Sequence, residues 1–220
     1  MYRVLKKIKQ DNKEFVSSEE LQEYSKDFYQ DYRMISDYLV TRGYLLNILD
    51  NLYYVKTEEE LNHNRRKYSI LELVAKGLKI KNIKNWYFGL YTALELNNIE
   101  HKHENELFYL INDQILKGKP IEILGQKFRF LTFKNVLFDF GIIKNKIKYS
   151  DHEKTILDLI YLWQYNHIND NRILIEVSKL MKGISEEKIV KYSKYYPESN
   201  RKVLKKALNK LEIIHQSTSI

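Results

Sequence analysis

The stretch from Phe15 to Lys56 constrains the fold most, because it predicts two short helices and a hairpin in a fixed order. Ser17 is followed three residues later by Glu20, a capping box that begins a helix. A second helix is predicted over residues 29–42, with Gly43 as its stop. Two short helices joined by a tight turn are the core of a helix-turn-helix.

The residues that follow predict a wing. Apolar runs at 44–46 and 52–55 flank Asp50-Asn51, a pair that tolerates the positive φ of a hairpin tip. With a further helix predicted over residues 2–13, residues 1–56 form an N-terminal winged helix-turn-helix domain. Such a domain binds double-stranded DNA by placing its second motif helix in the major groove.

Two groups of side chains are expected to contact DNA, one at base edges and one at the phosphate backbone. Residues 1–56 carry nine Lys/Arg and nine Asp/Glu, so we expect modest, salt-sensitive affinity or two copies on one operator repeat. The same balance of charge fits the alternative that the winged helix docks another protein. The expected base contacts are Gln30, Arg33 and Ser36, and the expected backbone contacts are Arg42, Asn47, Asn51 and Lys56.

The rest of the chain predicts an α+β protein. After a linker or short helix at residues 57–66 we expect an α/β domain at residues 67–170 and a helical C-terminal subdomain at residues 171–220. Short strand-like runs predict a small mixed or antiparallel sheet in the central domain. Those runs are residues 107–111, 121–124, 126–133 and 142–149. Helices are predicted over residues 68–78 and 85–98. A further helix is predicted in the apolar segment that follows Ser150 and Glu153, which have the spacing of a capping box.

Composition limits the classes of function. The net charge of +8 is concentrated in residues 171–220, where eleven Lys/Arg face five Asp/Glu, and such a basic surface suits nucleic acid or an acidic protein. The absence of cysteine excludes thiolate zinc sites and cysteine nucleophiles. No apolar run approaches the ~20 residues of a membrane span, and no secretion signal is visible. We therefore expect a cytoplasmic protein without membrane contact.

The sequence contains no strong match to a known catalytic motif. No Gly-rich phosphate loop, zinc-protease motif or nucleophile elbow is found. His101 and His103 lack a third nearby ligand, and Glu186 with Lys188 lacks a partner acid on a strand. We expect no enzymatic activity, no cofactor and no metal, and a nucleic-acid enzyme is the least favoured reading.

Two segments of the central domain carry a resemblance. Gly89, Thr92, Ala93 and Leu94 are similar to the pattern Gly-x-Ser/Thr-Ala-Leu, with one extra residue between Gly89 and Thr92. The chain also departs from the pattern at Phe88, where many relatives carry a small residue. A second pattern, Ser-Asp-x-Glu-Lys-Thr-x-x-Asp, opens the long helix. Together with the winged helix these patterns resemble the AbiEi family of antitoxins over roughly residues 1–165. The second pattern is matched by Ser150, Asp151, Glu153, Lys154, Thr155 and Asp158.

The resemblance implies the antitoxin of a toxin–antitoxin or abortive-infection system. Its winged helix is expected to repress the protein's own operon, and its second domain to neutralise a toxin that resembles a nucleotidyltransferase. The resemblance leaves open whether the toxin is bound directly. The alternative is a stand-alone winged-helix regulator whose second domain senses a ligand or dimerises.

Overall fold

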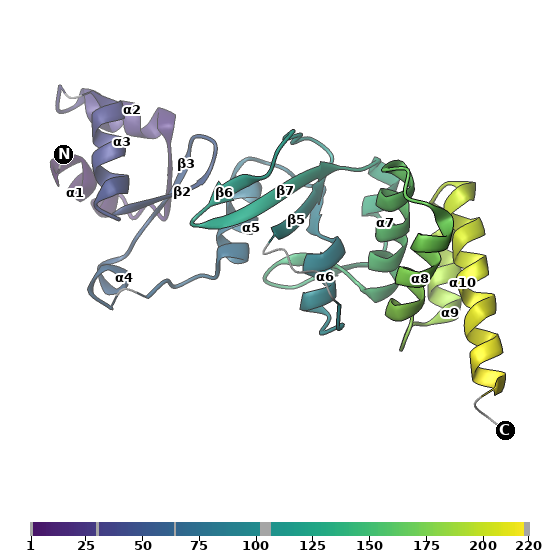
Figure 1. Cartoon of the computed structure of the whole chain (residues 1–220). Helices are drawn as coiled ribbons and strands as arrows, with labels where there is room; N and C mark the ends of the chain where they lie inside the picture. Colours follow the sequence, from purple (N-terminus) through teal and green to yellow (C-terminus); the bar gives the residue numbers. More distant parts are fainter. Residues whose placement is uncertain (1, 30, 64, 102–106, 218–220) are drawn as a thin grey trace. The chain divides into compact units, whose positions relative to one another are not determined.

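The computed structural model confirms the predicted α+β class, because helices and β-sheets occur in both compact units of the chain (Figure 1). Among the described helices, none has both the length and the apolar composition of a membrane span. The described residues are 2–29, 31–63, 65–101 and 107–217, with side chains up to Lys210.

The first unit, residues 1–84 with 122–126, contains the predicted winged helix-turn-helix. Helix α2 and helix α3 are followed by a hairpin of β2 and β3, and the short strand β1 completes an antiparallel sheet of order β1-β3-β2. The elements are α1 (Tyr2–Gln10), β1 (Phe15–Ser17), α2 (Ser18–Lys26), α3 (Tyr32–Thr41), β2 (Leu45–Leu49), β3 (Leu52–Val55), α4 (Glu58–His63) and α5 (Ile70–Ile80).

Local signals set the ends of the two motif helices. The capping box is confirmed, since the Glu20 amide donates to Ser17 Oγ at 3.2 Å and the Ser17 amide donates to Glu20 Oε2 at 2.8 Å. Helix α3 begins later than predicted because Asp31 caps it, accepting a hydrogen bond from the Arg33 amide at 2.7 Å. Asn51 takes φ +59° at the hairpin tip, as predicted.

The segment after the wing is anchored by a buried carboxylate. Glu60, which is 3% exposed, accepts hydrogen bonds from the Tyr54 hydroxyl at 2.8 Å and from the Lys67 amide at 2.7 Å. Helix α5 then packs on the wing, where a Cβ on Gly77 would lie 3.0 Å from Leu49 Cδ1. This packing groups α5 with the first unit, whereas the sequence reading began the second domain at residue 67.

The second unit, residues 85–121 and 127–220, contains most of a mixed sheet of order β6-β7-β5-β4-β9-β8. Strand β4 pairs antiparallel with β5 and parallel with β9, and β5 pairs parallel with β7. The predicted mixed sheet is therefore confirmed. Its strands are β4 (Trp86–Phe88), β5 (Leu107–Asn112), β6 (Ile121–Ile123), β7 (Gln126–Thr132), β8 (Ile142–Lys144) and β9 (Lys148–Ser150).

The prediction of one helix over residues 85–98 is wrong. Residues Trp86–Phe88 form a central strand, all three residues are buried, and only Leu90–Leu96 forms helix α6. A short run of large aromatic residues suits a strand buried on both faces, and such a run cannot be told from a buried helix by periodicity alone. Gly89 lies between the strand and α6. Only glycine fits there, because a Cβ would lie 2.5 Å from Ile111 Cδ1 on the neighbouring strand.

The prediction of one strand over residues 142–149 is also wrong in detail. Strands β8 and β9 form an antiparallel hairpin that turns at residues 145–147, where the Asn145 amide donates to the Ile147 carbonyl at 3.0 Å. The polar run Lys144 to Lys146 favours such a turn over an uninterrupted strand.

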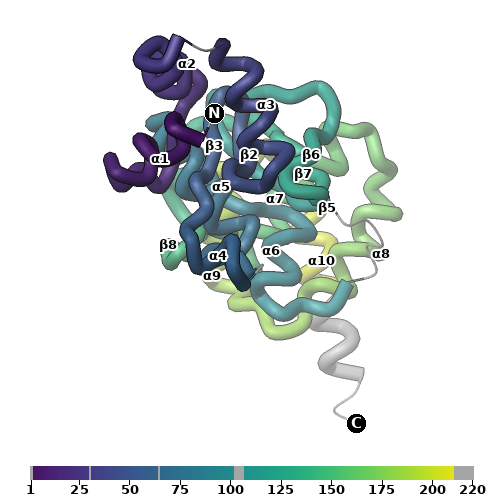
Figure 2. The backbone as a smooth tube through the Cα atoms, turned by 90° about the vertical axis from the view of Figure 1, so that its left-hand side faces the viewer, coloured from purple at the N-terminus to yellow at the C-terminus, as the bar shows by residue number. Residues whose placement is uncertain are grey.

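The C-terminal helical segment is present as predicted. Helices α8, α9 and α10 pack around α7, which itself packs against α6 (Figures 1 and 2). Their apolar faces, including Ile160, Ile173 and Val203, share one core with the sheet. The helices are α7 (His152–Tyr165), α8 (Asp170–Leu180), α9 (Glu186–Ser193) and α10 (Glu198–Ser217), and a 3-10 turn spans Asn135–Phe138.

Candidate nucleic-acid interface and a buried lysine centre

Helix α3 divides into a buried face and an exposed face. Ile35 and Leu39 are fully buried in the core of the first unit. Arg33, Asp37 and Thr41 are exposed and repeat every four residues, so they share the opposite face. The helix-turn-helix therefore presents one arginine and one aspartate on the helix that would enter the major groove.

One of the predicted base contacts does not lie on this exposed face. Ser36 is only 8% exposed, and its hydroxyl donates to the Arg33 carbonyl at 2.9 Å, so it serves the helix and not a base edge. The sequence reading missed this because Ser36 sits at the border between the two faces. Gln30 lies outside the described residues. Arg33 is therefore the base-edge candidate that the structure places on the exposed face of α3.

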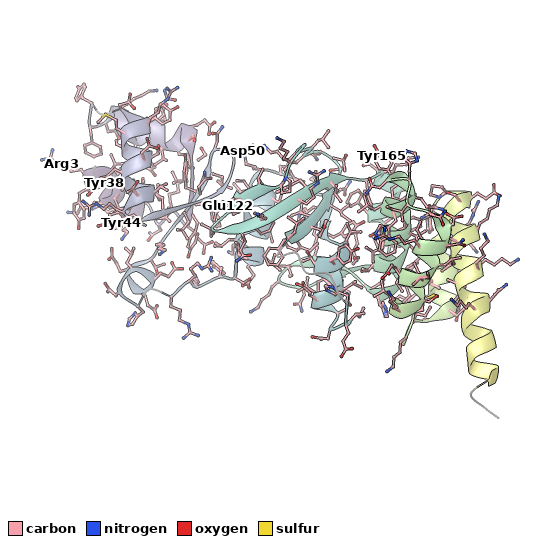
Figure 3. The ribbon with its side chains drawn as sticks, viewed as in Figure 1. Arg3, Tyr38, Tyr44, Asp50, Glu122 and Tyr165 are labelled. Carbon is pink, nitrogen blue, oxygen red and sulfur yellow. The ribbon has the colours of Figure 1, made fainter. Side chains whose placement is uncertain are left out.

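The predicted backbone contacts lie at the end of α3 and on the wing. Arg42 is exposed, with its guanidinium 5.7 Å from the centre of the Tyr38 ring. Asn47 and Asn51 are exposed on the hairpin, whereas Lys56 is half-buried. Figure 3 shows the side chains of this unit, with Tyr38 on α3 and Asp50 at the tip of the wing labelled. Short polar side chains on a wing suit hydrogen bonds to phosphate oxygens.

The residues of the second pattern in the central domain point inward instead. Ser150, Lys154, Thr155 and Asp158 have no exposed surface, and Glu153 is 5% exposed. Charged side chains are almost never buried to this degree unless they are paired. The residues of this pattern therefore form buried polar contacts inside the second unit.

The buried lysine centre consists of Lys154 and Asp158 on α7 with three aromatic residues. Lys154 Nζ lies 3.3 Å from Asp158 Oδ1 and donates to the Tyr196 hydroxyl at 3.2 Å. The Tyr196 hydroxyl donates to Asp158 Oδ1 at 2.6 Å, and the Tyr87 hydroxyl donates to Oδ2 at 2.9 Å. The rings of Tyr87 and Phe140 each lie 4.7 Å from Nζ, which suits cation–π contact.

Burial perturbs the titration of every group in this centre. It lowers the pKa of Lys154 and raises the pKa of Asp158, and the attraction between the two opposes both shifts. Burial, together with the Asp158 carboxylate, raises the pKa of Tyr87 and Tyr196 well above the ordinary value. Both phenols therefore remain hydrogen-bond donors at neutral pH.

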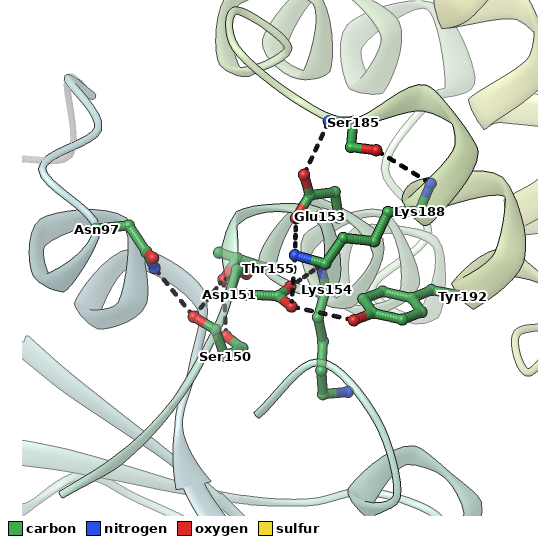
Figure 4. Close-up of polar contacts among 9 residues, drawn as sticks. All are labelled: Asn97, Ser150, Asp151, Glu153, Lys154, Thr155, Ser185, Lys188 and Tyr192. Carbon is green, nitrogen blue, oxygen red and sulfur yellow. Dashed lines mark hydrogen bonds and ion pairs between the residues drawn. The ribbon is translucent and has the colours of Figure 1, made fainter. Parts of the chain in front are cut away.

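The predicted capping box of Ser150 and Glu153 is wrong. Helix α7 is capped by Asp151, which accepts from the Lys154 amide at 2.9 Å. Glu153 points to α9 instead, accepting from Lys188 Nζ and from the Ser185 amide, each at 2.8 Å (Figure 4). The sequence signal of a capping box is local, and this partner lies more than thirty residues away.

Lys188 links two acids of α7 to α9. Its ammonium lies 2.8 Å from Glu153 Oε2 and 3.1 Å from Asp151 Oδ2 (Figure 4). Burial acts to raise the pKa of Glu153, but hydrogen bonds from Lys188 and from the Ser185 amide outweigh it, so the pKa is lowered. The Tyr192 hydroxyl donates to Asp151 Oδ2 at 3.2 Å, which adds a third contact between α9 and the start of α7.

The remaining pattern residues join the sheet to the helices. Ser150 Oγ and Thr155 Oγ1 lie 2.7 Å apart, and Thr155 also donates to the Asp151 carbonyl at 2.6 Å. Thr92 on α6 accepts from the Tyr109 amide of β5 at 2.8 Å. Ala93 is fully buried, so its small side chain permits the close packing of α6.

The weak catalytic motifs gain no support from geometry. Lys188 is engaged by α7, and Glu186 is exposed on α9. Of the histidine pair, His103 lies outside the described residues. Over the part of the chain that the structure describes, no group of three or more His, Asp or Glu side chains could hold a metal ion.

Comparisons with known proteins identify a shared fold. No protein-family model matches the chain, and no curated protein matches it. A solved structure, the crystal structure of RV2827C protein from Mycobacterium tuberculosis, is similar with a TM-score of 0.53 and 9% sequence identity. The alignment covers 94% of this chain and 75% of that chain. At this identity the likeness shows the fold alone.

A first prediction concerns the buried pair. Lys154→Met should lower the free energy of unfolding by about 3–5 kcal/mol, because Asp158 stays buried without its cation. The double variant Lys154→Met, Asp158→Asn should recover much of this loss, since asparagine needs no counter-charge. Urea unfolding followed by circular dichroism measures both. Additive losses in the double variant would contradict a charge-based role for the pair.

A second prediction concerns pH. The folded-state pKa of Glu153 is lowered, so its contribution is present above the unfolded pKa of about 4.3 and is lost as pH falls through the folded value. Glu153→Gln should therefore cost about 1–3 kcal/mol of unfolding free energy at neutral pH and little at about pH 3. Paired urea titrations across this range test it, and a pH-independent difference would contradict the ionic role.

Proposed function

We propose that the protein is a DNA-binding repressor that acts as the antitoxin of a toxin–antitoxin or abortive-infection system. The winged helix of the first unit is the observation that carries the DNA-binding part. Its helix α3 exposes Arg33 and its hairpin exposes Asn47 and Asn51, which is the arrangement needed to read one groove and hold the flanking phosphates.

The antitoxin part is supported by the combination of this winged helix with the second unit and its two sequence patterns. The second unit is the candidate for neutralising a nucleotidyltransferase-like toxin. Because the pattern residues Lys154 and Asp158 are fully buried, contact with a toxin would use other side chains of this unit. Neither repression nor neutralisation needs a catalytic residue in this chain.

A third prediction tests DNA reading. Arg33→Ala should weaken binding to the DNA upstream of the protein's own gene by about 1–3 kcal/mol and reduce the preference over random DNA, because arginine pairs with guanine edges. Fluorescence anisotropy with both DNAs at two salt concentrations measures this. Arg3→Ala removes the same charge from an exposed position of helix α1 and should leave the preference unchanged. An equal preference in wild type and Arg33→Ala would remove Arg33 as a reader.

A fourth prediction tests neutralisation separately. If the neighbouring gene encodes a nucleotidyltransferase, the full chain should restore growth of cells that express it, and Arg33→Ala should rescue equally well when both are expressed from an unrelated promoter. The reason is that Arg33 belongs to the unit assigned to DNA. Growth curves and protein levels measure the rescue. Failure of the wild-type chain to rescue would favour a stand-alone regulator over an antitoxin.

A further inference from the structure

A cavity of about 1020 Å³ lies in the second unit between α6, the end of α7 and α8. Its inner wall is apolar, since Leu94, Ile173 and Leu180 line it and are buried. The volume is at the upper end of the roughly 300–1,000 Å³ that small-molecule sites occupy. A ligand larger than a single ion or a simple sugar therefore fits.

Two aromatic side chains give the cavity flat apolar walls. Tyr91 on α6 and Trp163 on α7 both line it and are half-buried, so part of each ring is accessible. The Tyr91 ring lies 5.7 Å from the ring of His101, which also lines the cavity. The Tyr91 ring also lies 5.7 Å from the Tyr109 ring, so its exposed part is the part that faces the cavity. Partly exposed aromatic rings of this kind can stack on planar heterocycles.

Basic side chains on α8 and in the turn that follows it line the same cavity. Arg172 and Lys182 are exposed and form no ion pair within the part of the chain that the structure describes. Lys179 is held by Glu176 at 2.8 Å, one turn away on the same helix. Two cations thus remain at the cavity for an anionic group, and Glu100 adds a hydrogen-bond acceptor to its lining.

We propose that this cavity binds a nucleoside phosphate, with the base against Tyr91 and Trp163 and the phosphate at Arg172 and Lys182. Arginine and lysine form charge-assisted hydrogen bonds with phosphate oxygens. A purely apolar ligand would leave both cations unused, and inorganic phosphate would leave both rings unused. The site lies wholly in the second unit, so this inference stands whether or not the first unit reads DNA.

Direct binding tests the proposal without DNA or toxin. The full chain is titrated by calorimetry with each of the four common ribonucleoside monophosphates and triphosphates, and with adenosine and inorganic phosphate as partial ligands. At least one nucleotide should bind with one-to-one stoichiometry and change the fluorescence of Trp163. Trp86, the other tryptophan of the chain, is 5% exposed in β4, so Trp163→Phe should abolish the fluorescence change while calorimetric binding persists.

Matched variants locate the site. Arg172→Ala and Lys182→Ala should each weaken binding about tenfold or more, since each removes a charge-assisted contact worth about 1.5–3 kcal/mol. Lys191→Ala removes an exposed lysine of α9 outside the cavity and should leave affinity unchanged. Circular dichroism confirms that all variants are folded. The proposal is overturned if no nucleotide binds at millimolar concentration, if inorganic phosphate binds as tightly, or if all three variants behave alike.

Discussion

The pairing of Lys154 with Asp158 is the interaction on which the second unit depends most, because neither charge tolerates burial without the other. Tyr87 from the central strand and Tyr196 from the segment before α10 complete the coordination of the carboxylate. One carboxylate therefore joins the sheet, α7 and the C-terminal helices. Hydrogen bonds are directional, so a shift of α7 by one turn would lose all of them, whereas an apolar contact would only be repacked. Gly141 shows how tight this centre is, since at φ +62° its missing Cβ would lie 2.7 Å from Lys154 Cβ.

In the first unit the topology favours binding to DNA, whereas the charge does not. Its topology is that of a winged helix-turn-helix, yet Arg33 shares the exposed face of α3 with Asp37, and residues 1–56 have no net charge. Affinity for DNA grows with the number of phosphates that cations neutralise. A winged helix whose charges cancel is thus better suited to sequence specificity than to high affinity for DNA. Two copies on a repeat would supply the missing affinity, because linked binding multiplies weak contacts.

The parts of the fold that could be predicted are those set by neighbours in sequence. Ser17 and Glu20, and the turn at Asn51, lie within a few residues of the groups they bind. The failures involve partners far along the chain. Glu153 has the spacing of a capping residue, but its partner is Lys188 on another helix. The strand Trp86–Phe88 reads as helix locally and becomes a strand because it pairs with β5 and β9. No local pattern marks a lysine as fully buried, since the residues that satisfy Lys154 come from three separate segments.

The residues of the Ser-Asp-x-Glu-Lys-Thr-x-x-Asp pattern are buried, so they bear on the fold more than on function. Here Ser150, Lys154, Thr155 and Asp158 are fully buried and bonded to one another or to neighbouring elements, so they hold the second unit together whatever the protein binds. The likeness to a solved structure at 9% identity shows that this fold can persist while most of the sequence changes. Function must then be decided by exposed side chains, whose identity the fold does not dictate. In this chain those are Arg33 on α3 and the two cavity cations, Arg172 on α8 and Lys182 just after it, and all three side chains are exposed.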